Sequence, residues 1–478
     1  MCKFALKLHC MFIKQLYTGC LSEAAYYVES KGEAAIIDPL RDIQVYLDLA
    51  KERNSSIKYI FETHFHADFV SGHLDLSKAT GAPIVYGPDT ETNFPIYKAH
   101  DGEIFRIGEV ELEVLHTPGH TIESSCYLLS DEDGKANAIF TGDTLFVGDV
   151  GRPDLSSGNL TQEQLASLLY DSIQKKILTL DDDIIVYPAH GAGSSCGKNI
   201  GPETYSTIGE EKETNYALQP QSKAEFIQAV TDGLSMPPQY FSINARINKE
   251  GYESLDEVLE DGLKAIPVSE FRELIKDEDL IILDTRDAVK FTEAFVPGAI
   301  NIGLNGRFAE WAGSLLSFDR PIALVTDAGK ERESVIRLAR VGFGKMAGFL
   351  EGGIESWIRA GEPIDLIINV EADELAMDIP FDKRLMIIDV RSETEFADGH
   401  IRGAMNIPLG NLSDPGSMAH IEDQHNVAVH CGGGYRSVIA SSLLKRQGIH
   451  NLHNIVGGWN AIKNQKGIEI VKEKSILN

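Results

Sequence analysis

Apolar runs of strand length alternate with polar segments along the first half of the chain, and one of them leads directly into ligand-type side chains. The run 57–61 is followed by His64, His66 and Asp68. A buried strand with this pattern ends where the polar residues begin, so these three side chains are expected at a rigid strand end. Ligands two apart on an extended chain can point into one cavity, and imidazole together with carboxylate suits zinc, iron or manganese.

Three further apolar runs end in the same kind of side chain. They lead to His120, Asp143 and His190. A single histidine is more often a loop residue bonded to backbone, but four strand ends that carry such side chains favour a metal or catalytic site. The sequence therefore predicts one site built from the ends of four strands.

These four segments resemble, in order and content, the metal motifs of the metallo-β-lactamase superfamily. The resemblance implies an α/β fold, an αββα sandwich, for a first domain at residues 11–250. In that family the first motif reads H-x-H-x-D-H, and its last histidine serves a second metal ion. Phe69 stands at that position here. A phenyl ring cannot ligate a metal, which argues against a binuclear zinc hydrolase.

Within the family, the chain is similar to the persulfide dioxygenase branch, and segments 142–146 and 151–154 strengthen that likeness. It implies one Fe(II) per chain held by His64, His120 and Asp143, because two histidines and one carboxylate leave positions open for substrate and dioxygen. Zinc is the alternative metal. The other ligand-type residues would orient water and ligands, or remain from a second metal site: His66, Asp68 and His190.

A glycine-rich segment, 191–198, follows the last candidate ligand and is expected to line a small-molecule pocket. Cys196 in this segment is either a thiol that contacts or carries sulfur near the metal, or a small buried apolar residue. Arg152 is a candidate for binding the carboxylate of a thiol substrate, with an ion-pair arginine as the alternative. Glutathione-using relatives place aspartate and tyrosine directly after the last histidine. This chain has glycine and alanine there, which disfavours glutathione itself.

The second half of the chain repeats itself at an offset of 105 residues, with Asp284 matching Asp389 and Gly353 matching Gly458. Each copy alternates apolar strands with helices, which predicts a parallel sheet with helices on both faces. The repeat is too long for a solenoid unit and indicates a duplicated domain. The two predicted domains span residues 266–364 and 370–474.

Each copy resembles a rhodanese domain. The second carries Cys431 in a Cys-x-x-x-x-Arg loop that ends at Arg436, between a strand and a helix. Backbone N–H groups of such a loop form a cradle for an anion or a persulfide, and the helix N-terminus with Arg436 favours the thiolate form of Cys431. A structural cysteine is the alternative. The rest of the loop would supply binding contacts: Gly432, Gly433, Gly434, Tyr435 and Ser437.

The first copy has Asp327 at the place aligned with Cys431. A carboxylate cannot carry sulfane sulfur. This copy is therefore predicted to be inactive and to serve as a spacer, a docking surface or an allosteric module.

Composition narrows the range of partners. The chain has 44 lysines and arginines against 72 aspartates and glutamates, a formal charge of −28, which would repel nucleic-acid phosphates and anionic lipid. No apolar run approaches the roughly 20 residues of a membrane span. Six cysteines without paired spacing are typical of a reduced chain, so a cytoplasmic location is expected. No signal peptide is expected, and Met1 and Met11 are both candidate starts.

These patterns together predict an enzyme of sulfur metabolism: an iron dioxygenase that oxidises a low-molecular-weight persulfide to sulfite, coupled to sulfur transfer that yields thiosulfate. One alternative is a zinc-dependent, glyoxalase-II-like thioester hydrolase fused to a rhodanese. Another is a non-catalytic persulfide carrier or sensor. The expected partners are a thiol persulfide and dioxygen. The identity of the thiol and the assembly state, including a homo-oligomer, stay open.

Overall fold

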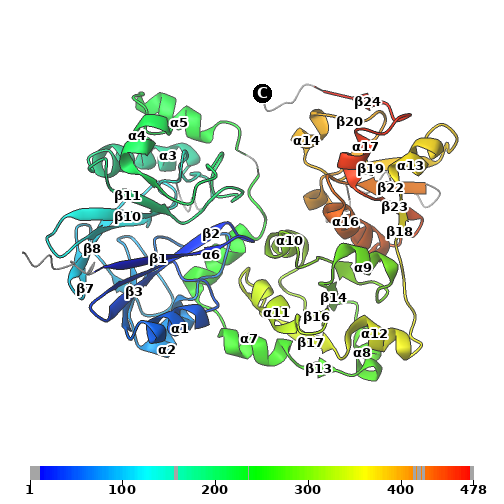
Figure 1. Ribbon diagram of the computed structural model, residues 1–478, viewed down its shortest axis with the longest axis horizontal. Helices are drawn as coiled ribbons and strands as arrows, with labels where there is room; N and C mark the ends of the chain where they lie inside the picture. Colours follow the sequence, from blue (N-terminus) through cyan, green and yellow to red (C-terminus); the bar gives the residue numbers. More distant parts are fainter. Residues whose placement is uncertain are drawn as a thin grey trace, which may run out of the picture. The chain divides into compact units, whose positions relative to one another are not determined.

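The computed structural model describes residues 11–155, 160–234, 236–412, 416, 421 and 426–473 of the 478-residue chain. Cys2, Cys10 and Lys474 lie outside the described residues. The chain divides into two compact units (Figure 1). One comprises residues up to 255 with 339–342, and the other comprises 256–338 with 343 onwards.

The first unit contains two six-stranded sheets. The first sheet has the order β1 (Phe12–Thr18), β2 (Glu23–Ser30), β3 (Glu33–Ile37), β4 (Ser56–Phe61), β5 (Ile84–Tyr86), β6 (Tyr97–Lys98). The second has the order β12 (Ser206–Thr207), β11 (Ile185–Pro188), β10 (Ala136–Gly142), β9 (Ser125–Ser130), β8 (Val110–His116), β7 (Ile104–Ile107). The helices are α1 (Gln44–Glu52), α2 (His73–Thr80), α3 (Gln162–Ser172) continued by the π-helix η1 (Ile173–Ile177), α4 (Ile208–Thr214), α5 (Lys223–Thr231) and α6 (Phe241–Glu250).

Alternate residues of each strand face opposite sides of its sheet. One side packs against the other sheet and the other side packs against helices, which gives four layers: helices, sheet, sheet, helices. Tyr26 of β2 packs between the sheets, with its ring centroid 4.9 Å from that of Phe140 in β10. Its neighbour Tyr27 faces the other way and joins a core with Tyr46 of α1. Leu169 of α3 packs in a third core, with residues of the outer face of the second sheet. The predicted αββα sandwich is therefore confirmed.

Local sequence signals explain where several helices begin and end. Thr161, the N-cap of α3, accepts from the backbone N–H of Gln164, and the Gln164 side chain bonds back to the Thr161 N–H, forming a capping box. Gly81 ends α2 at φ 75°, a left-handed conformation that glycine adopts without a Cβ penalty.

The second unit contains two five-stranded sheets of the same topology, and every pairing within them is parallel. The first sheet has the order β13 (Ala265–Ile266), β17 (Met346–Leu350), β16 (Ile322–Val325), β14 (Ile281–Asp284), β15 (Ile300–Asn301). The second has the order β18 (Ile368–Val370), β23 (Leu452–Ile455), β22 (Asn426–His430), β19 (Leu385–Asp389), β21 (Met405–Asn406). A small pair, β20 (His400–Ile401) with β24 (Ile470–Val471), completes the strands.

The helices of this unit also correspond between the copies. The first copy follows α7 (Leu255–Gly262) and has α8 (Val268–Leu274), α9 (Ala288–Glu293), α10 (Phe308–Leu315), α11 (Glu331–Ala339) and α12 (Gly353–Arg359). The second has α13 (Ala372–Asp378), α14 (Glu393–Ala397), the 3₁₀ turn η2 (Leu409–Asn411), α16 (Tyr435–Arg446) and α17 (Gly458–Ile462). Two domains with matching parallel sheets confirm the predicted α/β architecture.

The sheet register corrects one alignment made from the sequence. Asp284 pairs with Val325 in the first copy, whereas Asp389 pairs with His430 in the second. The residue that follows each strand is therefore Thr326 in the first copy and Cys431 in the second. Thr326, not Asp327, occupies the cysteine position. The prediction was wrong by one residue because the loop between strand and helix is one residue longer in the first copy. An alignment that starts from the helix therefore shifts every loop residue by one position.

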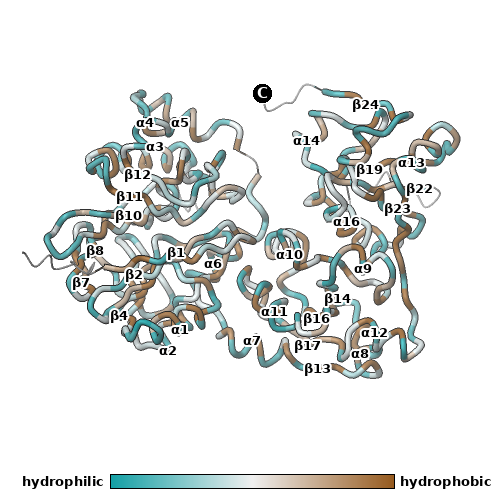
Figure 2. The backbone as a smooth tube through the Cα atoms, in the orientation of Figure 1, coloured by the Kyte–Doolittle hydropathy of each residue, from teal (hydrophilic) through white to brown (hydrophobic). Residues whose placement is uncertain are grey.

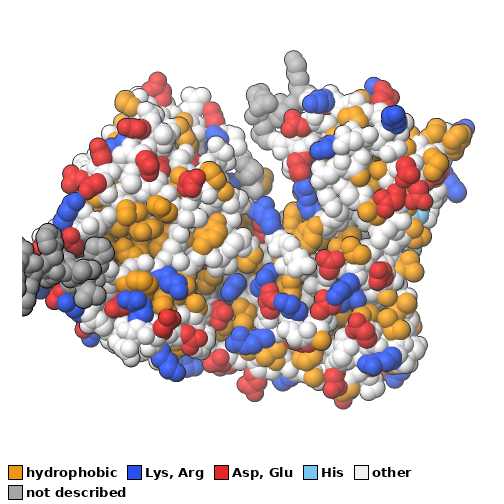
Figure 3. All heavy atoms as spheres, in the orientation of Figure 1, with side chains coloured by type: hydrophobic (Ala, Val, Ile, Leu, Met, Phe, Trp, Pro, Cys, Tyr) orange, Lys and Arg blue, Asp and Glu red, His pale blue; other side chains and the backbone are white. Residues whose placement is uncertain are grey.

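Hydrophobic residues recur along the strands of both units (Figure 2), as the sequence pattern predicts. Acidic and basic side chains intermingle over the face of the molecule that Figure 3 shows. Among the described helices, none is both long and apolar enough to cross a membrane.

Candidate functional site

Three side chains from separate strand ends converge in the first unit. His64 follows β4, His120 follows β8 and Asp143 follows β10, and all three are buried. Asp143 Oδ2 lies 3.3 Å from His120 Nε2 and 3.7 Å from His64 Nε2. The three ligand atoms lie within 4.8 Å of one another, which is compact enough for one metal ion.

Neighbouring groups orient both imidazoles. His120 Nδ1 lies 2.8 Å from the carbonyl oxygen of Arg152, so this nitrogen donates and Nε2 keeps its lone pair for the site. His64 Nδ1 lies 2.9 Å from the hydroxyl of Thr63. That hydroxyl and the Thr63 N–H both donate to Asp38, at 2.9 and 2.7 Å. A second layer of hydrogen bonds therefore positions the first set of ligands.

The residues present fit a cation. Both carboxylate oxygens of Asp143 are buried, and neither has a hydrogen-bond partner among the described residues. Such a group is costly unless an ion satisfies it. Burial, with further repulsion from His66 and His120, lowers the pKa of His64 well below its usual value, so its imidazole is neutral and able to ligate.

His66 is held differently from His64, although only one residue separates them. Its ring stacks on Phe69 with centroids 4.3 Å apart. Its Nε2 lies 3.2 Å from Asp38 and 3.7 Å from Glu62. Burial alone would lower the pKa of His66, but the Asp38 and Glu62 carboxylates raise it to about 10. A protonated imidazole has no lone pair to offer a metal, so this arrangement disfavours His66 as a ligand.

Asp68 and His190 lie on the other side of Asp143. His190 Nε2 is 3.5 Å from Asp68 Oδ2 and 3.5 Å from Asp143 Oδ1. These two groups, with His66, form a second compact set of ligand-type atoms. Because Phe69 supplies no ligand atom, this set offers a second metal ion fewer ligands than the family motif does.

The thiol of Cys196 is also near the site. Its Sγ lies within 4.8 Å of ligand atoms of Asp143 and His190. Burial, together with the Asp68 and Asp143 charges, raises the pKa of this thiol well above its usual value. Cys196 is therefore buried, as one interpretation of the sequence requires, and it lies beside the candidate ligands, as the other requires.

Arg152 spans the same region. Its guanidinium donates to both carboxylate oxygens of Asp154, each at 2.7 Å, and to the carbonyl of Ser195 at 3.3 Å. Its backbone N–H donates to the carbonyl of Cys196 at 3.0 Å. The side chain is buried and matched by a carboxylate, which corresponds to the ion-pair alternative, while its backbone links His120 to the Cys196 loop.

The second candidate centre is the loop after β22. Cys431 is buried, and its Sγ accepts from the N–H of Gly434 at 3.1 Å and lies 3.6 Å from the hydroxyl of Ser437. Gly434 has φ 112°, a left-handed conformation in which other residues are strained. The loop thus curves so that a backbone N–H points at the sulfur, as the predicted cradle requires.

Two other predicted loop residues have partners elsewhere in this unit. Arg436 forms a bidentate pair with Glu395 of α14, with distances of 2.7 and 2.8 Å. The hydroxyl of Tyr435 donates to the carbonyl of Gly303 in the first copy, at 2.8 Å. Its ring leaves no room for a Cβ at Gly306, which would come 2.5 Å from Tyr435 Cζ. The copy without the cysteine therefore contacts the Cys431 loop of the other copy through Tyr435.

Gly432 and Gly433 complete the described loop. The carbonyl of Gly432 accepts from the N–H of Asn460 at 3.0 Å, which ties the loop to α17. A Cβ on Gly433 would come 3.9 Å from the Asn460 amide nitrogen, an ordinary contact. The loop therefore needs glycine for its curvature at Gly434 rather than for space at Gly433.

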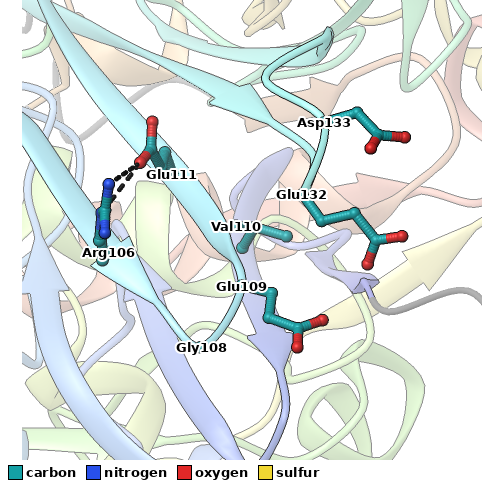
Figure 4. A pocket seen from close by; sticks show the side chains of 7 residues that line it. All are labelled: Arg106, Gly108, Glu109, Val110, Glu111, Glu132 and Asp133. Atoms are coloured by element: carbon teal, nitrogen blue, oxygen red, sulfur yellow. Dashed lines mark hydrogen bonds and ion pairs between the residues drawn. The ribbon is translucent and has the colours of Figure 1, made fainter.

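A surface hollow of about 540 Å³ lies at the β7–β8 turn of the first unit (Figure 4). Its charged lining is mainly acidic, and the side chain of Arg106 is paired with Glu111. It brings together none of the predicted site residues. The residues that line it are Arg106, Gly108, Glu109, Val110, Glu111, Glu132 and Asp133.

Sequence reasoning missed three residues around these centres. Asp38 follows β3, so the strand-end rule that found His64 could also have found it. Glu62 lies directly after β4, two residues before the first motif, and accepts from Ser71 Oγ at 3.1 Å. Glu395 stands in a Ser-x-x-Glu capping box, a signal that predicts a helix start but not a partner for Arg436.

Comparison with known protein families matches one segment of the first unit and two segments of the second. Residues 18–190 match the Metallo-beta-lactamase superfamily, and residues 267–360 and 371–465 each match the Rhodanese-like domain.

Individual relatives point to two activities. The mitochondrial persulfide dioxygenase ETHE1 of Mus musculus is 33% identical over 223 residues, which cover 45% of this chain and 78% of that protein. The probable hydroxyacylglutathione hydrolase glo2 of Schizosaccharomyces pombe is 35% identical over 159 residues, which cover 33% of this chain and 58% of that protein. This chain thus spans less than two thirds of the length of glo2.

A solved structure covers more of the chain. The metallo-beta-lactamase from Staphylococcus aureus subsp. aureus COL is 33% identical, with a TM-score of 0.64, and the match covers 72% of this chain and 99% of that one. The likeness thus extends beyond the two-sheet unit into the second unit.

Proposed function

Because the chain belongs to the metallo-β-lactamase superfamily and continues into two rhodanese-like domains, we propose that it oxidises a low-molecular-weight persulfide to sulfite and transfers sulfane sulfur at Cys431 to give thiosulfate. The observation that carries the proposal is that the two histidines of the first motif have different contacts. His64 converges with His120 and Asp143, whereas His66 is paired with Asp38 and stacked on Phe69. A single ion with two histidines and one carboxylate suits Fe(II).

The proposed oxidation balances as persulfide, dioxygen and water giving thiol, sulfite and two protons. Fe(II), when bound by His64, His120 and Asp143, would supply open positions for the persulfide sulfur and dioxygen. The protein's own contribution is orientation. The Arg152 carbonyl fixes the His120 ring, and Thr63 fixes the His64 ring. The buried thiol of Cys196 lies beside the ligands, where it would contact substrate sulfur.

The proposed transfer needs no metal. The sulfur lone pair of sulfite attacks the outer sulfur of a Cys431 persulfide, the S–S bond breaks, and Cys431 leaves as a thiolate while thiosulfate departs. The Gly434 N–H, which already donates to Cys431 Sγ, would stabilise that thiolate. We assign the protein to the cytoplasm as part of this proposal, on its cysteine content.

A zinc-dependent thioester hydrolase is the second candidate, since hydroxyacylglutathione hydrolases are also among the relatives and Asp68 and His190 are in place beside Asp143. It would bind two metal ions and consume no dioxygen. The two proposals therefore differ in the number of metal ions per chain and in the consumption of dioxygen.

The deciding experiment measures metal content and oxygen uptake with the same preparation. Protein isolated with iron available is expected to hold one iron per chain and to consume dioxygen with one of a panel of small thiol persulfides. His120→Ala and Asp143→Ala should each abolish the uptake, and His190→Ala should reduce it less. Two bound zinc ions with thioester hydrolysis and no oxygen uptake would refute the dioxygenase.

A further inference from the structure

The guanidinium of Arg436 is not free to meet an anion at the Cys431 loop. Both of its terminal nitrogens donate to Glu395, at 2.7 and 2.8 Å. The geometry is the bidentate fork that makes arginine–carboxylate pairs the strong ones. The pair is part-exposed, with 24% of the Arg436 side chain and 40% of the Glu395 side chain accessible, so an anion from solvent can reach it.

Glu395 is itself held in place by its own helix. Its Oε2 accepts from the backbone N–H of Ser392 at 3.0 Å and from the Ser392 hydroxyl at 3.1 Å. These contacts form the capping box of α14. The carboxylate is therefore fixed before any ligand arrives, and little entropy opposes its pairing with Arg436.

The pair stands directly beside the cradle. A Cβ on Gly432, the residue after Cys431, would come 3.2 Å from Arg436 Nη2 and 3.9 Å from Glu395 Oε1. One negative charge thus stands at the mouth of a loop that is shaped to receive a negative substrate.

The first copy also has an ion pair that starts from the equivalent helix, with the charges reversed. Lys290 of α9 occupies the position that Glu395 occupies in α14, each three residues after its helix N-cap. Its Nζ lies 2.9 Å from Asp327, the counterpart of Gly432. There the loop carries the carboxylate and the helix the cation. In the copy with the cysteine, the cation is Arg436 in the first turn of α16, directly after the loop, and the fixed carboxylate on α14 competes for it.

We propose that Glu395 sets the affinity of the Cys431 loop for small anions: an anion such as sulfite or thiosulfate must displace the Glu395 carboxylate to bind Arg436. This proposal rests on the sulfur transfer proposed for Cys431 and names a residue that controls it. Glu395 weakens the binding of all small anions, so that abundant non-reacting ones such as sulfate do not occupy the cradle. It acts on binding rather than on the transfer step.

The test compares E395Q with E393Q. Glutamine can keep the capping-box contact to Ser392, so E395Q removes the charge without removing the helix cap. Glu393 lies exposed on the same helix, and E393Q removes an equal charge away from Arg436. E395Q is expected to lower the KM for thiosulfate, in transfer to cyanide, by about fivefold with kcat nearly unchanged, since an exposed pair is worth up to about 1 kcal/mol. E393Q should leave both constants as in the wild type.

A second readout does not depend on transfer. Sulfate should slow the alkylation of Cys431 by iodoacetamide, followed by mass spectrometry of the Cys431 peptide, at about fivefold lower concentration in E395Q than in the wild type. An unchanged KM and unchanged sulfate protection would overturn the proposal. So would equal effects of E395Q and E393Q, or a higher KM in E395Q, which would mean that Glu395 positions Arg436 for the anion. Wild-type protein without transfer activity would refute the proposed function instead, and the alkylation result would still decide the role of Glu395.

Discussion

Phe69 decides how the first motif is used, because it both removes a ligand and fixes a neighbour. Its side chain is fully buried and stacks on His66, whose Nε2 points to Asp38. Phe69 offers no ligand atom, and the pairing with Asp38 disfavours His66 as a ligand, although the backbone still brings Asp68 and His190 together. The identity of the side chain at position 69 thus distinguishes a site for one metal ion from a site for two in the same fold.

Restoring the histidine should restore a second metal site. Phe69→His places an imidazole directly after Asp68, whose carboxylate lies 3.5 Å from His190, and completes the first motif of the family. We expect bound metal to rise from one towards two ions per chain, measured by elemental analysis after exhaustive dialysis. Phe69→Leu is the matched control, since it also removes the ring but adds no ligand. Equal metal content in the two variants would show that position 69 does not control the second ion.

The charge state of Glu395 makes a pH prediction. Hydrogen bonds from Arg436 lower the pKa of Glu395 to about 2, below the ordinary 4.5. A lowered pKa means that the pair is intact above the ordinary value and is lost only as the pH falls through about 2. The KM ratio of wild type to E395Q should therefore stay constant between about pH 5 and pH 8. A ratio that falls towards one at the acidic end would show that the carboxylate is not held by Arg436.

At the scale of elements, strand ends were predictable and side-chain directions were not. The apolar runs before His64, His120, Asp143 and His190 identify the ends of strands, because burial of a strand forces its pattern. The turn of His66 towards Asp38 depends on packing between segments 28 residues apart, which no local pattern encodes. The same holds for the pair between Arg436 and Glu395, which joins two helices 41 residues apart.

The corrected register also changes what the first copy's loop means. Ser334 N–H bonds to the carbonyl of Lys330 at the start of α11, as Val438 N–H bonds to Gly434 at the start of α16. Four residues lead from Thr326 to Lys330, but only three lead from Cys431 to Gly434. The extra residue changes the path of the turn, so we expect a side chain at position 326 to meet other N–H groups than Cys431 does.

Placing a thiol in the first copy should therefore not create a transferase. In a Cys431→Ser background, Thr326→Cys should show less than about a hundredth of wild-type sulfur transfer, because the longer loop lacks the cradle and Asp327 adds a negative charge beside it. Asp327→Ala alone should leave wild-type transfer nearly unchanged. Transfer is measured from thiosulfate to cyanide, with thermal unfolding as the check on folding. Substantial activity in the Thr326→Cys double variant would show that the thiol alone limits this copy.

For the whole molecule, the proposal assigns consecutive reactions to separate centres, and each centre can be silenced without touching the other. Cys431→Ser keeps the loop but replaces the thiol by a hydroxyl that is too weakly acidic to act as a sulfur nucleophile near neutral pH. Oxygen uptake should persist, while the product changes from thiosulfate to sulfite. Arg436→Ala should give a partial shift, because the thiol remains and only the charge support is lost.

Cys196→Ser should do the opposite, because the Cys196 thiol lies beside Asp143 and His190 in the oxygen-consuming centre. We expect it to lower oxygen uptake about tenfold or more while transfer from thiosulfate to cyanide stays at the wild-type rate. The decisive measurement follows oxygen, sulfite and thiosulfate in one reaction for both variants. Undiminished thiosulfate from Cys431→Ser, after subtraction of the uncatalysed reaction of sulfite with persulfide, would contradict the division of labour. Loss of oxygen uptake in Cys431→Ser would instead require that Cys431 delivers the persulfide to the metal centre.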